Sequence, residues 1–513
     1  MSTRTYRDAI EHLNSLQSNA ATLDAVRASG GRSSEFAIPE MLEYLERIGY
    51  APEQLNALNV IHITGTKGKG STGAFADSIL RHAMPRWKVG LYTSPHLVAV
   101  RERIRINGIP LSEELFTKYF FEIWDRLVQN NKRLVPTTPP MPGYFRFITL
   151  MAFHVFLEER VDATVLEVGV GGTYDSTNIV PRPVVTGITA LGIDHVNVLG
   201  KTITEIAWQK GGIFKTGVPA FTVNQPEDAM KMLQSRAKEL KATGLTVVPE
   251  EPTLSELKLG LAGAHQIQNA SLAISLAKSF LAKQAGYSFE DCGLPQFFIS
   301  GLVETKWPGR CQTIADPSRS NVSWYLDGAH TIESLQCCIQ WFVSPEVGIP
   351  LASESKSTSR FLVFNCTSGR SGETFLAAIS ESIRAQLAAN DLVMKDTSTF
   401  FDHVIFCTNV TYADGHFKGG ELFIILLSYL TTKAIHQSDL EGLKTQQSLA
   451  SSWSSLYPTF PLKNIHVLPS IEHAVKLIES KLELGSETKV LVTGSLHLVG
   501  GLIEVAGLSE AAL

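Results

Sequence analysis

Short apolar runs alternate with helix-like segments from residue 58 onward, and this alternation is the feature that most constrains the fold. The runs are nearly continuous in apolar residues, which is typical of strands buried on both faces of a parallel sheet. Helices must then cover both faces, so the pattern predicts an α/β fold. The predicted strands span residues 58–64, 89–93, 161–168, 184–189 and 218–223, and the predicted helices between them include 71–84 and 144–159.

The alternation pauses near residues 301–310, where Trp307-Pro-Gly-Arg310 is typical of a connector. A chain of 513 residues also exceeds what one hydrophobic core usually serves. We therefore predict two domains, 1–304 with a P-loop-type parallel sheet and 305–513 as a smaller Rossmann-like α/β domain. The predicted strands of the second domain are 324–327, 361–366, 403–407 and 490–493.

Three stretches of the second domain have a distinct composition. Residues 352–359 and 437–456 are polar and rich in Ser, and we predict that both are exposed insertions. Residues 423–430 form the most apolar stretch of the chain. This stretch is too short to cross a bilayer, so it suits a buried helix or strand, and no transmembrane segment is expected.

The composition excludes several classes of protein. Hydrophobic residues make up 44% and charged residues 19%, as in a soluble globular enzyme. A net charge of −5 gives no dominant footprint for nucleic acid. Six cysteines form no CxxC pair, so reduced thiols are expected. The N-terminus lacks the apolar core of a signal peptide, so a cytoplasmic location is favoured, with a mitochondrial form as the alternative.

The segment Thr64-Gly-Thr-Lys-Gly-Lys-Gly-Ser-Thr72 lies between a predicted strand and a predicted helix. Glycines let backbone amides curl around phosphate oxygens, and the helix N-terminus adds positive charge. Lys69 suits the β- and γ-phosphates of a nucleotide, and the Ser71 hydroxyl suits Mg²⁺. Gly70 separates these two residues, unlike the standard P-loop spacing, so a glycine-rich turn without a nucleotide is the alternative. The candidate nucleotide-binding residues are Gly65, Thr66, Lys67, Gly68, Lys69, Gly70, Ser71 and Thr72.

Two polar residues follow successive predicted strands. Glu167 ends the strand 161–168, and His195 comes just after the strand 184–189. Ligand sites of open α/β sheets lie at these carboxyl ends, and a carboxylate is a preferred ligand of Mg²⁺. We predict that both residues bind one metal, with a salt-bridged acid and a structural loop histidine as the alternatives. Lys210, by its charge alone, is more typical of a solvated lysine.

The chain resembles the folylpolyglutamate synthases, relatives of the Mur peptidoglycan ligases. The resemblance extends from about residue 6 to about residue 500, and its motifs are specific in order and spacing. The motifs that carry it are residues 65–71, 167–172, His195, Lys210, 265–269 and Asp327-Gly-Ala-His330. Residues 92–97, 101–107 and 144–147 are similar to the eukaryotic branch of the family.

The resemblance implies that ATP binds the glycine-rich loop together with two Mg²⁺ ions, and a monovalent cation such as K⁺ is a further candidate. It implies that Lys210 is carbamylated, which turns a cation into a metal-binding anion. Here the family's common Glu-Lys-Ala-Gly segment reads Gln209-Lys-Gly-Gly212. The implied metal ligands are Ser71, Glu167, His195 and Lys210, and Asn269 would meet the nucleotide.

The resemblance also assigns roles to the substrate-facing residues. Arg310, Asp327 and His330 would close over ATP and bind phosphate and glutamate, although without the family each is typical of an ordinary surface or turn residue. The implied catalytic residues are Lys69, Lys210, Asp327 and His330. The loop that contacts the pterin would contain Thr93, Ser94, Pro95 and His96. Residues 1–304 would be the ATP-binding Mur-ligase-like central domain and 305–513 the glutamate-ligase domain.

The implied reaction is the ATP-dependent addition of L-glutamate to the γ-carboxylate of a folate through an acyl phosphate. Folate and glutamate would be the substrates, nucleic acid would not be a partner, and the family suggests a monomer. A dihydrofolate synthase or an enzyme with both activities would share the ATP and metal residues. A Mur-type cell-wall ligase fits the segments 93–97 and 101–107 less well. A non-catalytic nucleotide-binding regulator on the same fold is the competing function from another class.

Overall fold

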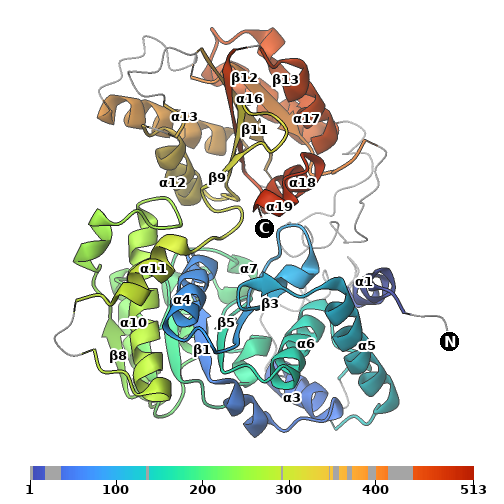
Figure 1. The fold of residues 1–513 in the computed structure, drawn as a ribbon, viewed down its shortest axis with the longest axis vertical. Helices are drawn as coiled ribbons and strands as arrows, with labels where there is room; N and C mark the ends of the chain where they lie inside the picture. The colour runs from blue at the N-terminus through green and yellow to red at the C-terminus, as the bar shows by residue number, and fades with distance from the viewer. Residues whose placement is uncertain are drawn as a thin grey trace. The chain divides into compact units, whose positions relative to one another are not determined.

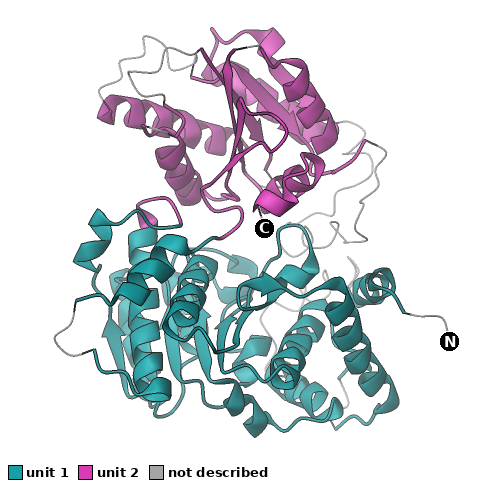
Figure 2. Cartoon of the chain, viewed as in Figure 1, with its two compact units in different colours: residues 1–260, 266–306 teal, residues 261–265, 307–513 magenta. Residues whose placement is uncertain are grey.

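The computed structural model describes residues 4–17, 36–134, 138–289, 293–345, 347–349, 357–366, 372–390, 400–413, 443–483 and 485–512. The chain divides into two compact units, shown in Figure 2. Unit 1 comprises Met1–Gly260 and Gln266–Lys306, and unit 2 comprises Leu261–His265 and Trp307–Leu513.

Unit 1 is built on an eight-stranded sheet with the order β4-β3-β2-β5-β1-β6-β7-β8 (Figure 1). β1 lies between β5 and β6 and is parallel to both, so the carboxyl ends of these three strands meet at one edge. The strands are β1 Val60–Thr64, β2 Val89–Tyr92, β3 Ile104–Ile106, β4 Ile109–Pro110, β5 Ala163–Glu167, β6 Val185–Ile188, β7 Pro219–Thr222 and β8 Gly244–Val247.

Helices cover both faces of this sheet, as predicted for buried parallel strands. Close approaches identify two of them, because a Cβ on Gly90 of β2 would meet Phe156 of α6, and one on Gly73 of α4 would contact Val165 of β5. The helices of unit 1 are α1 Tyr6–Ser15, α3 Ala37–Arg47, α4 Lys69–Ala83, α5 Glu113–Gln129, α6 Tyr144–Glu158, α7 Val196–Leu199, α8 Ile203–Gly211, α9 Glu227–Glu239, α10 His265–Ala285 and α11 Gln296–Glu304. Short 3₁₀ segments are Pro52–Leu58, Val100–Arg103, Ser176–Ile179 and Pro252–Glu256.

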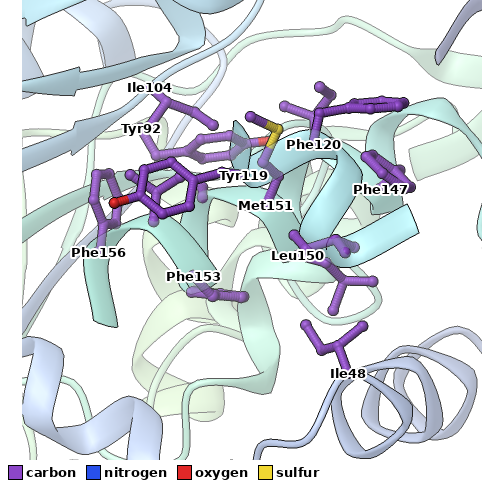
Figure 3. Packing of buried hydrophobic residues seen from close by; sticks show 14 of the residues in the cluster. Ile48, Tyr92, Ile104, Tyr119, Phe120, Phe147, Leu150, Met151, Phe153 and Phe156 are labelled. Carbon is purple, nitrogen blue, oxygen red and sulfur yellow. The ribbon is translucent and has the colours of Figure 1, made fainter. Parts of the chain in front are cut away.

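A large aromatic core fixes α5 and α6 against the sheet (Figure 3). Phe120 of α5 packs on Phe147 of α6 with ring centroids 4.7 Å apart, and Tyr92 of β2 belongs to the same buried cluster. Fully burying side chains of this size stabilises the fold by roughly 1.5–3 kcal/mol each. This core therefore holds α5 and α6 against β2, the strand that pairs with β5.

An antiparallel hairpin at the edge of the sheet was not predicted. β3 pairs antiparallel with β2 and with β4, and Asn107 and Gly108 form the tight turn between β3 and β4. Both turn residues have positive φ, at 52° and 81°, as in the Asn-Gly turns that match the twist of a hairpin. The sheet is therefore mostly parallel with an antiparallel edge.

Unit 2 contains a six-stranded sheet with the order β13-β12-β11-β14-β10-β9, parallel except for β9. Phe364 and Phe406, on neighbouring strands, lie in one buried cluster with α12, α13 and α16, whereas α17 packs on α18. The strands are β9 Gln312–Ala315, β10 Val322–Leu326, β11 Thr358–Phe364, β12 His403–Cys407, β13 Ile465–Leu468 and β14 Glu487–Thr493. The helices are α12 Ile332–Phe342, α13 Gly372–Ala389, α16 Lys444–Leu456, α17 Ile471–Ser480, α18 Leu496–Val505 and α19 Ser509–Ala512, with a 3₁₀ turn at Leu462–Asn464.

The prediction of an exposed insertion at 437–456 is wrong over its described part. Residues 444–456 form α16, whose Leu449 and Trp453 are buried one turn apart. This apolar pair packs against the sheet although Ser and Gln surround it in sequence. The predicted insertion at 352–359 also ends too late, because β11 begins at Thr358. Residues 352–356, 437–442 and 423–430 lie outside the described residues, and no described helix is long and apolar enough to span a membrane.

A buried histidine lies in the middle of β1. His62 is fully enclosed, and its Nε2 is 2.9 Å from the Thr177 hydroxyl. That hydroxyl donates to Asp175, so His62 Nε2 carries the proton and donates to Thr177. Burial lowers the pKa of His62 to about 3, and the charge of Lys215 adds to this effect. The native protein therefore keeps His62 neutral where an unfolded chain would protonate it.

We expect His62→Gln to reduce the acid sensitivity of the fold. The unfolded state binds a proton below pH 6.5 that the native state excludes, so unfolding becomes easier by about 1.4 kcal/mol per pH unit as the pH falls below that value. Gln keeps a donor for Thr177 and cannot titrate. Thermal melting midpoints recorded from about pH 7 down to about pH 5 should fall less steeply in the variant. If the melting midpoints of both proteins fall equally steeply with pH, His62 is not the source of the acid sensitivity.

Candidate functional site

The glycine-rich loop begins where β1 ends, at the sheet edge shared with β5 and β6. Two close approaches require its glycines. A Cβ on Gly65 would lie 1.8 Å from the Thr189 hydroxyl, and one on Gly68, at φ +87°, would lie 2.1 Å from Asn269 Oδ1. The Thr189 hydroxyl donates to the Lys67 carbonyl at 2.6 Å. The residues that follow β6 therefore fix the path of the loop.

The loop amides divide into two sets. The amides of Thr66 and Lys67 both donate to the Ala190 carbonyl, at 3.0 and 3.1 Å, so they are already engaged by the protein. Helical bonding starts with Thr72 N donating to Gly68 O at 2.8 Å. The first amides of α4, from Lys69 to Ser71, are those that a helix leaves for an external acceptor. The anion site of this loop thus centres on the start of α4.

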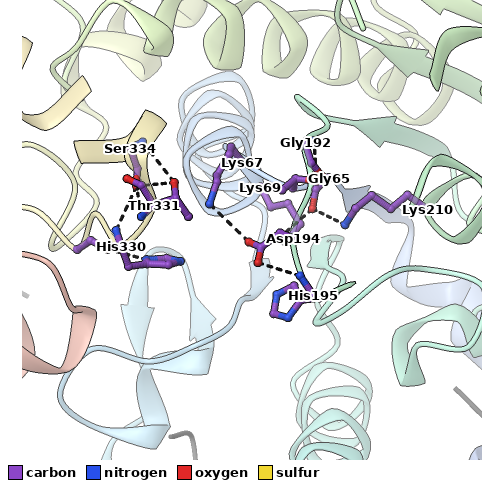
Figure 4. A network of polar contacts seen from close by, with 12 residues as sticks. Gly65, Lys67, Lys69, Gly192, Asp194, His195, Lys210, His330, Thr331 and Ser334 are labelled. Carbon is purple, nitrogen blue, oxygen red and sulfur yellow. Dashed lines mark hydrogen bonds and ion pairs between the residues drawn. The ribbon is translucent and has the colours of Figure 1, made fainter. Parts of the chain in front are cut away.

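Three lysines converge on this loop (Figure 4). Lys69 Nζ and Lys210 Nζ both donate to the Gly65 carbonyl, at 3.2 and 2.7 Å. Lys67 Nζ lies 3.5 Å from Asp194 Oδ2. Burial holds the pKa of Lys210 well below its usual range, and the neighbouring Lys69 charge lowers it further. The Lys69 ammonium group and the first amides of α4 make an electropositive site suited to an anion, and the Lys210 amine beside them is held toward its neutral form.

His195 and Glu167 flank the lysines on either side of β1. His195 adopts a left-handed conformation at φ 51°, and its amide donates to Asp194 Oδ1 at 2.9 Å. Burial lowers the pKa of His195 to about 4, and the nearby lysines contribute, so the imidazole is neutral and able to bind a metal. Glu167 is buried at the end of β5 and accepts the Ser94 amide at 3.1 Å.

The described residues contain no group of three His, Cys, Asp or Glu side chains placed to hold a metal ion. A metal here would depend on mixed donors, such as the Ser71 hydroxyl, water and phosphate oxygens, beside Glu167 and His195. Mg²⁺ suits this inventory, because it usually keeps several waters and takes only one or two carboxylates from the protein.

Gln266 and Asn269 of α10 reach the glycine-rich loop. Gln266 Nε2 donates to Ser71 Oγ at 3.4 Å, and Asn269 Nδ2 donates to Gln266 Oε1 at 2.9 Å. Thr72 Oγ1 also donates to the Asn269 carbonyl at 3.4 Å. The structure thus places Asn269 beside the loop and adds Gln266, which sequence reasoning did not single out. Its position three residues before Asn269, one helical turn away, was the available signal.

The segment 93–99 is organised by residues that the sequence analysis did not select. Glu102 accepts hydrogen bonds from the amides of Leu97, Val98 and Ala99, at 2.5–3.0 Å. Arg103 Nε donates to His96 Nδ1 at 2.9 Å. The predicted substrate residues therefore lie on a loop that is held by its own C-terminal flank.

Asp175 is a further buried acid near the end of β5. It accepts the Val170 amide at 3.1 Å and both the amide and the hydroxyl of Thr177. Burial raises its pKa although these hydrogen bonds oppose the shift. Asp175 therefore fixes the glycine-rich turn that follows Glu167. The only sequence signal for this role was that Asp175 lies eight residues after Glu167.

Unit 2 holds its own polar cluster at the end of β10. Asp327 accepts the amides of Cys311 and Ala329, at 2.7 and 2.9 Å. Arg310 Nη1 donates to the Gly309 carbonyl at 3.1 Å. His265 lies near both charges, since Asp327 raises and Arg310 lowers its pKa against a larger lowering by burial.

His330 opens the turn that precedes α12. Its amide donates to Ser334 Oγ at 3.1 Å, and its Nδ1 lies 2.9 Å from the Gly328 carbonyl. A carbonyl only accepts, so Nδ1 carries a proton and donates. The predicted residues Arg310, Asp327 and His330 therefore belong to one short region of unit 2.

Comparisons with known proteins give one family. No family model matches the sequence. Folylpolyglutamate synthase of Saccharomyces cerevisiae (strain FostersO) is 45% identical over 515 residues, which cover 98% of this chain and 87% of that protein. The Mycobacterium tuberculosis folylpolyglutamate synthase complexed with ADP and AMPPCP has a TM-score of 0.65 at 22% identity, covering 95% of this chain and 98% of that one. An FPGS–AMPPCP–folate complex has a TM-score of 0.60 at 23% identity, covering 95% and 99%. The predicted α/β fold is confirmed.

We expect Gly68→Ala to destabilise unit 1 more than Gly217→Ala does. Both glycines have positive φ, and an alanine there costs about 1–2 kcal/mol. A Cβ at Gly217 meets nothing within 4 Å, whereas at Gly68 it collides with Asn269. Thermal unfolding of both variants isolates the collision, and adding Asn269→Ala should recover part of the loss only in the Gly68 variant. Equal melting shifts would contradict the contact.

Proposed function

Because the chain belongs to the folylpolyglutamate synthase family, we infer that its glycine-rich loop and lysine cluster carry out the reaction of that family. The protein is an ATP-dependent ligase that adds glutamate to folate. The observation that carries the residue-level proposal is the convergence of Lys69 and Lys210 on the Gly65 carbonyl. The Lys69 ammonium group at this point suits the phosphates of ATP, and the buried Lys210 amine lies beside it.

The chemistry explains why ATP and a charged loop are needed. A carboxylate is a poor electrophile, so the γ-carboxylate of the folate first accepts the γ-phosphoryl group of ATP, giving an acyl phosphate and ADP. The amine of glutamate then attacks the acyl carbon, and phosphate leaves with the amide bond formed. Positioning and charge stabilisation dominate phosphoryl transfer. In our proposal Lys69 and the first amides of α4 position the β- and γ-phosphates and stabilise their negative charge.

The mixed donor set is our proposed Mg²⁺ site. Ser71 would hold the ion on the phosphates, and Glu167 and His195 would hold a second one. Bound Mg²⁺ offsets negative charge on the transferring phosphoryl group. The neutral state of His195 and the burial of Glu167 support these roles. The proposal also includes a bound monovalent cation such as K⁺, to which we assign no ligand residues.

Lys210 is our candidate for a carbamylated lysine. Carbamylation requires a neutral amine to attack carbon dioxide, and burial beside Lys69 favours the neutral form. The product is an anion, formed with release of a proton, and it would offset the charge of the Lys69 ammonium group beside it. A carbamate oxygen would also be a ligand for the second Mg²⁺ beside His195.

The remaining assignments extend the proposal to the substrates. Arg310, Asp327 and His330 of unit 2 would bind phosphate and incoming glutamate, and the buried carboxylate of Asp327 supports a fixed role for that loop. Thr93, Ser94, Pro95 and His96 would contact the folate. Asn269 would contact the nucleotide. The division into an ATP-binding domain, 1–304, and a glutamate-ligase domain, 305–513, a monomeric state and a cytoplasmic location remain proposals.

The carbamate makes a direct prediction. Protein equilibrated with carbon-13-labelled bicarbonate should show one carbamate signal by carbon NMR, and Lys210→Ala should abolish it. Lys215→Ala is the matched control, because Lys215 is also largely buried, with a pKa lowered to about 8. Loss of the signal in the Lys215 variant, or its survival in the Lys210 variant, would refute the assignment.

The function is tested by mass spectrometry of products formed from Mg-ATP, glutamate and tetrahydrofolate, with dihydropteroate in a parallel reaction. Tetrahydrofolate should gain successive glutamyl units. Turnover of dihydropteroate alone would indicate a dihydrofolate synthase, and turnover of both an enzyme with both activities. Absence of ligation despite ATP binding would support a non-catalytic protein.

Lys69→Met tests the loop in the same assay. Removing this ammonium group should lower turnover at least about 100-fold, since it loses a charge-assisted contact to the transferring phosphates. Lys231→Met is the matched control, because Lys231 is an exposed lysine of α9 paired with Glu227. Full activity of the Lys69 variant would falsify the assignment of the loop.

A further inference from the structure

Arg103 is a buried cation with an unused donor. Its side chain is 2% exposed, and its Nη2 atom has no hydrogen-bond partner among the described residues. The guanidinium lies over the ring of Tyr144, with 5.6 Å from Cζ to the ring centroid. None of the ion pairs formed by described acidic side chains involves Arg103. A buried guanidinium nitrogen without an acceptor is unfavourable, because it has lost its hydrogen bonds to water and gained none in return.

The other end of the guanidinium orients a residue of the proposed folate loop. Arg103 Nε donates to His96 Nδ1 at 2.9 Å. An accepting Nδ1 carries no proton, so a neutral His96 ring has its proton on Nε2. His96 is half-buried, which leaves this ring partly accessible. Arg103 therefore fixes both the tautomer and the direction of the His96 donor.

The position of Arg103 does not depend on the folate loop alone. Its carbonyl accepts the Thr93 amide at 3.0 Å, where β2 passes into the loop. The preceding Glu102 holds the amides of residues 97–99. The two consecutive residues thus tie down both ends of the loop. The Arg103 donors are fixed before any ligand arrives, which reduces the entropy lost on binding.

We propose that Arg103 is a substrate-contacting residue, whose Nη2 donates to an acceptor oxygen of the folyl substrate next to the His96 Nε2–H group. This inference rests on the proposed function. A positively charged fork beside a neutral imidazole donor selects a carbonyl or carboxylate oxygen. Folates offer both kinds, as ring and benzoyl carbonyls and as the α-carboxylate of glutamate. Tyr144, which is half-buried, covers the guanidinium at this point.

The test compares Arg103→Met, Arg103→Lys and Arg101→Met in steady-state kinetics. Arg101 belongs to the same segment and donates to the Leu111 carbonyl, so it is the matched control. We expect Arg103→Met to raise KM for tetrahydrofolate about 10- to 100-fold, the range for losing a hydrogen bond to a charged group. KM for ATP should be unchanged, and Arg101→Met should leave the KM values for tetrahydrofolate, ATP and glutamate unchanged. Arg103→Lys keeps the charge without the fork and should give an intermediate KM.

Two further measurements identify the folate oxygen that accepts from Arg103 and exclude a purely structural role for Arg103. Direct binding of tetrahydropteroate, which lacks the glutamate carboxylates, should weaken as much as that of tetrahydrofolate if a pterin or benzoyl carbonyl is the acceptor. Weakening for tetrahydrofolate alone assigns the α-carboxylate. An unchanged KM for tetrahydrofolate in Arg103→Met overturns the proposal, as does an equal rise in the KM for ATP. If that variant does not fold, the KM for tetrahydrofolate in Arg103→Lys decides in the same way.

The proposal and the ligase function fail in different ways. A wild-type protein that ligates no glutamate to tetrahydrofolate removes the function itself. A wild-type protein that ligates normally, together with an Arg103→Met variant of unchanged KM, removes only the role of Arg103.

Discussion

The Gly65 carbonyl and the two lysine side chains that share it are the constraint on which the rest of this site depends. A buried amine such as that of Lys210 keeps a positive charge only when anions or hydrogen bonds compensate it. One carbonyl oxygen between Lys69 and Lys210 compensates little, and Asp194 is engaged with Lys67 and the His195 amide. The protein alone therefore leaves positive charge at the carboxyl end of β1. In the proposed function, phosphate bound at Lys69 and a carbamate formed on Lys210 would compensate this charge.

The fold explains why this charge gathers there. β1 lies between β5 and β6, so the loop after β1 is flanked by the residue that ends β5 and by the loop after β6. Glu167 and His195 thus approach from opposite sides through parallel pairing alone. Gly65 and Gly68 allow Thr189 and Asn269 to touch the loop, where a Cβ would block both. The order of the strands and the absence of a Cβ atom at Gly65 and Gly68 together set the geometry of the site.

Sequence reasoning predicted the parts of the fold that follow from local pattern. Buried strands such as β1 and β5 are continuous apolar runs, and their positions were predicted to within a few residues. The β3–β4 hairpin and α16 escaped because the apolar pattern is short or interrupted there, although Asn107-Gly108 was a readable turn signal. Glu102 could not be predicted, since it accepts backbone amides whose proximity only the tertiary structure establishes. Gln266 was missed although it lies one helical turn before Asn269, because its contact with the Ser71 hydroxyl is also a tertiary one. The site residues chosen through the family resemblance lie near one another within each unit.

The helix α10 begins at His265, which belongs to unit 2, and continues with Gln266, which belongs to unit 1. The chain therefore passes between the units at three positions. A single genetic crossover near residue 306 would transfer the second unit between relatives without residues 261–265. His265, which is electrostatically linked to Asp327 and Arg310, would then come from the other parent. Such an exchange would therefore separate the polar cluster around Asp327 from the His265 that belongs to it in this chain.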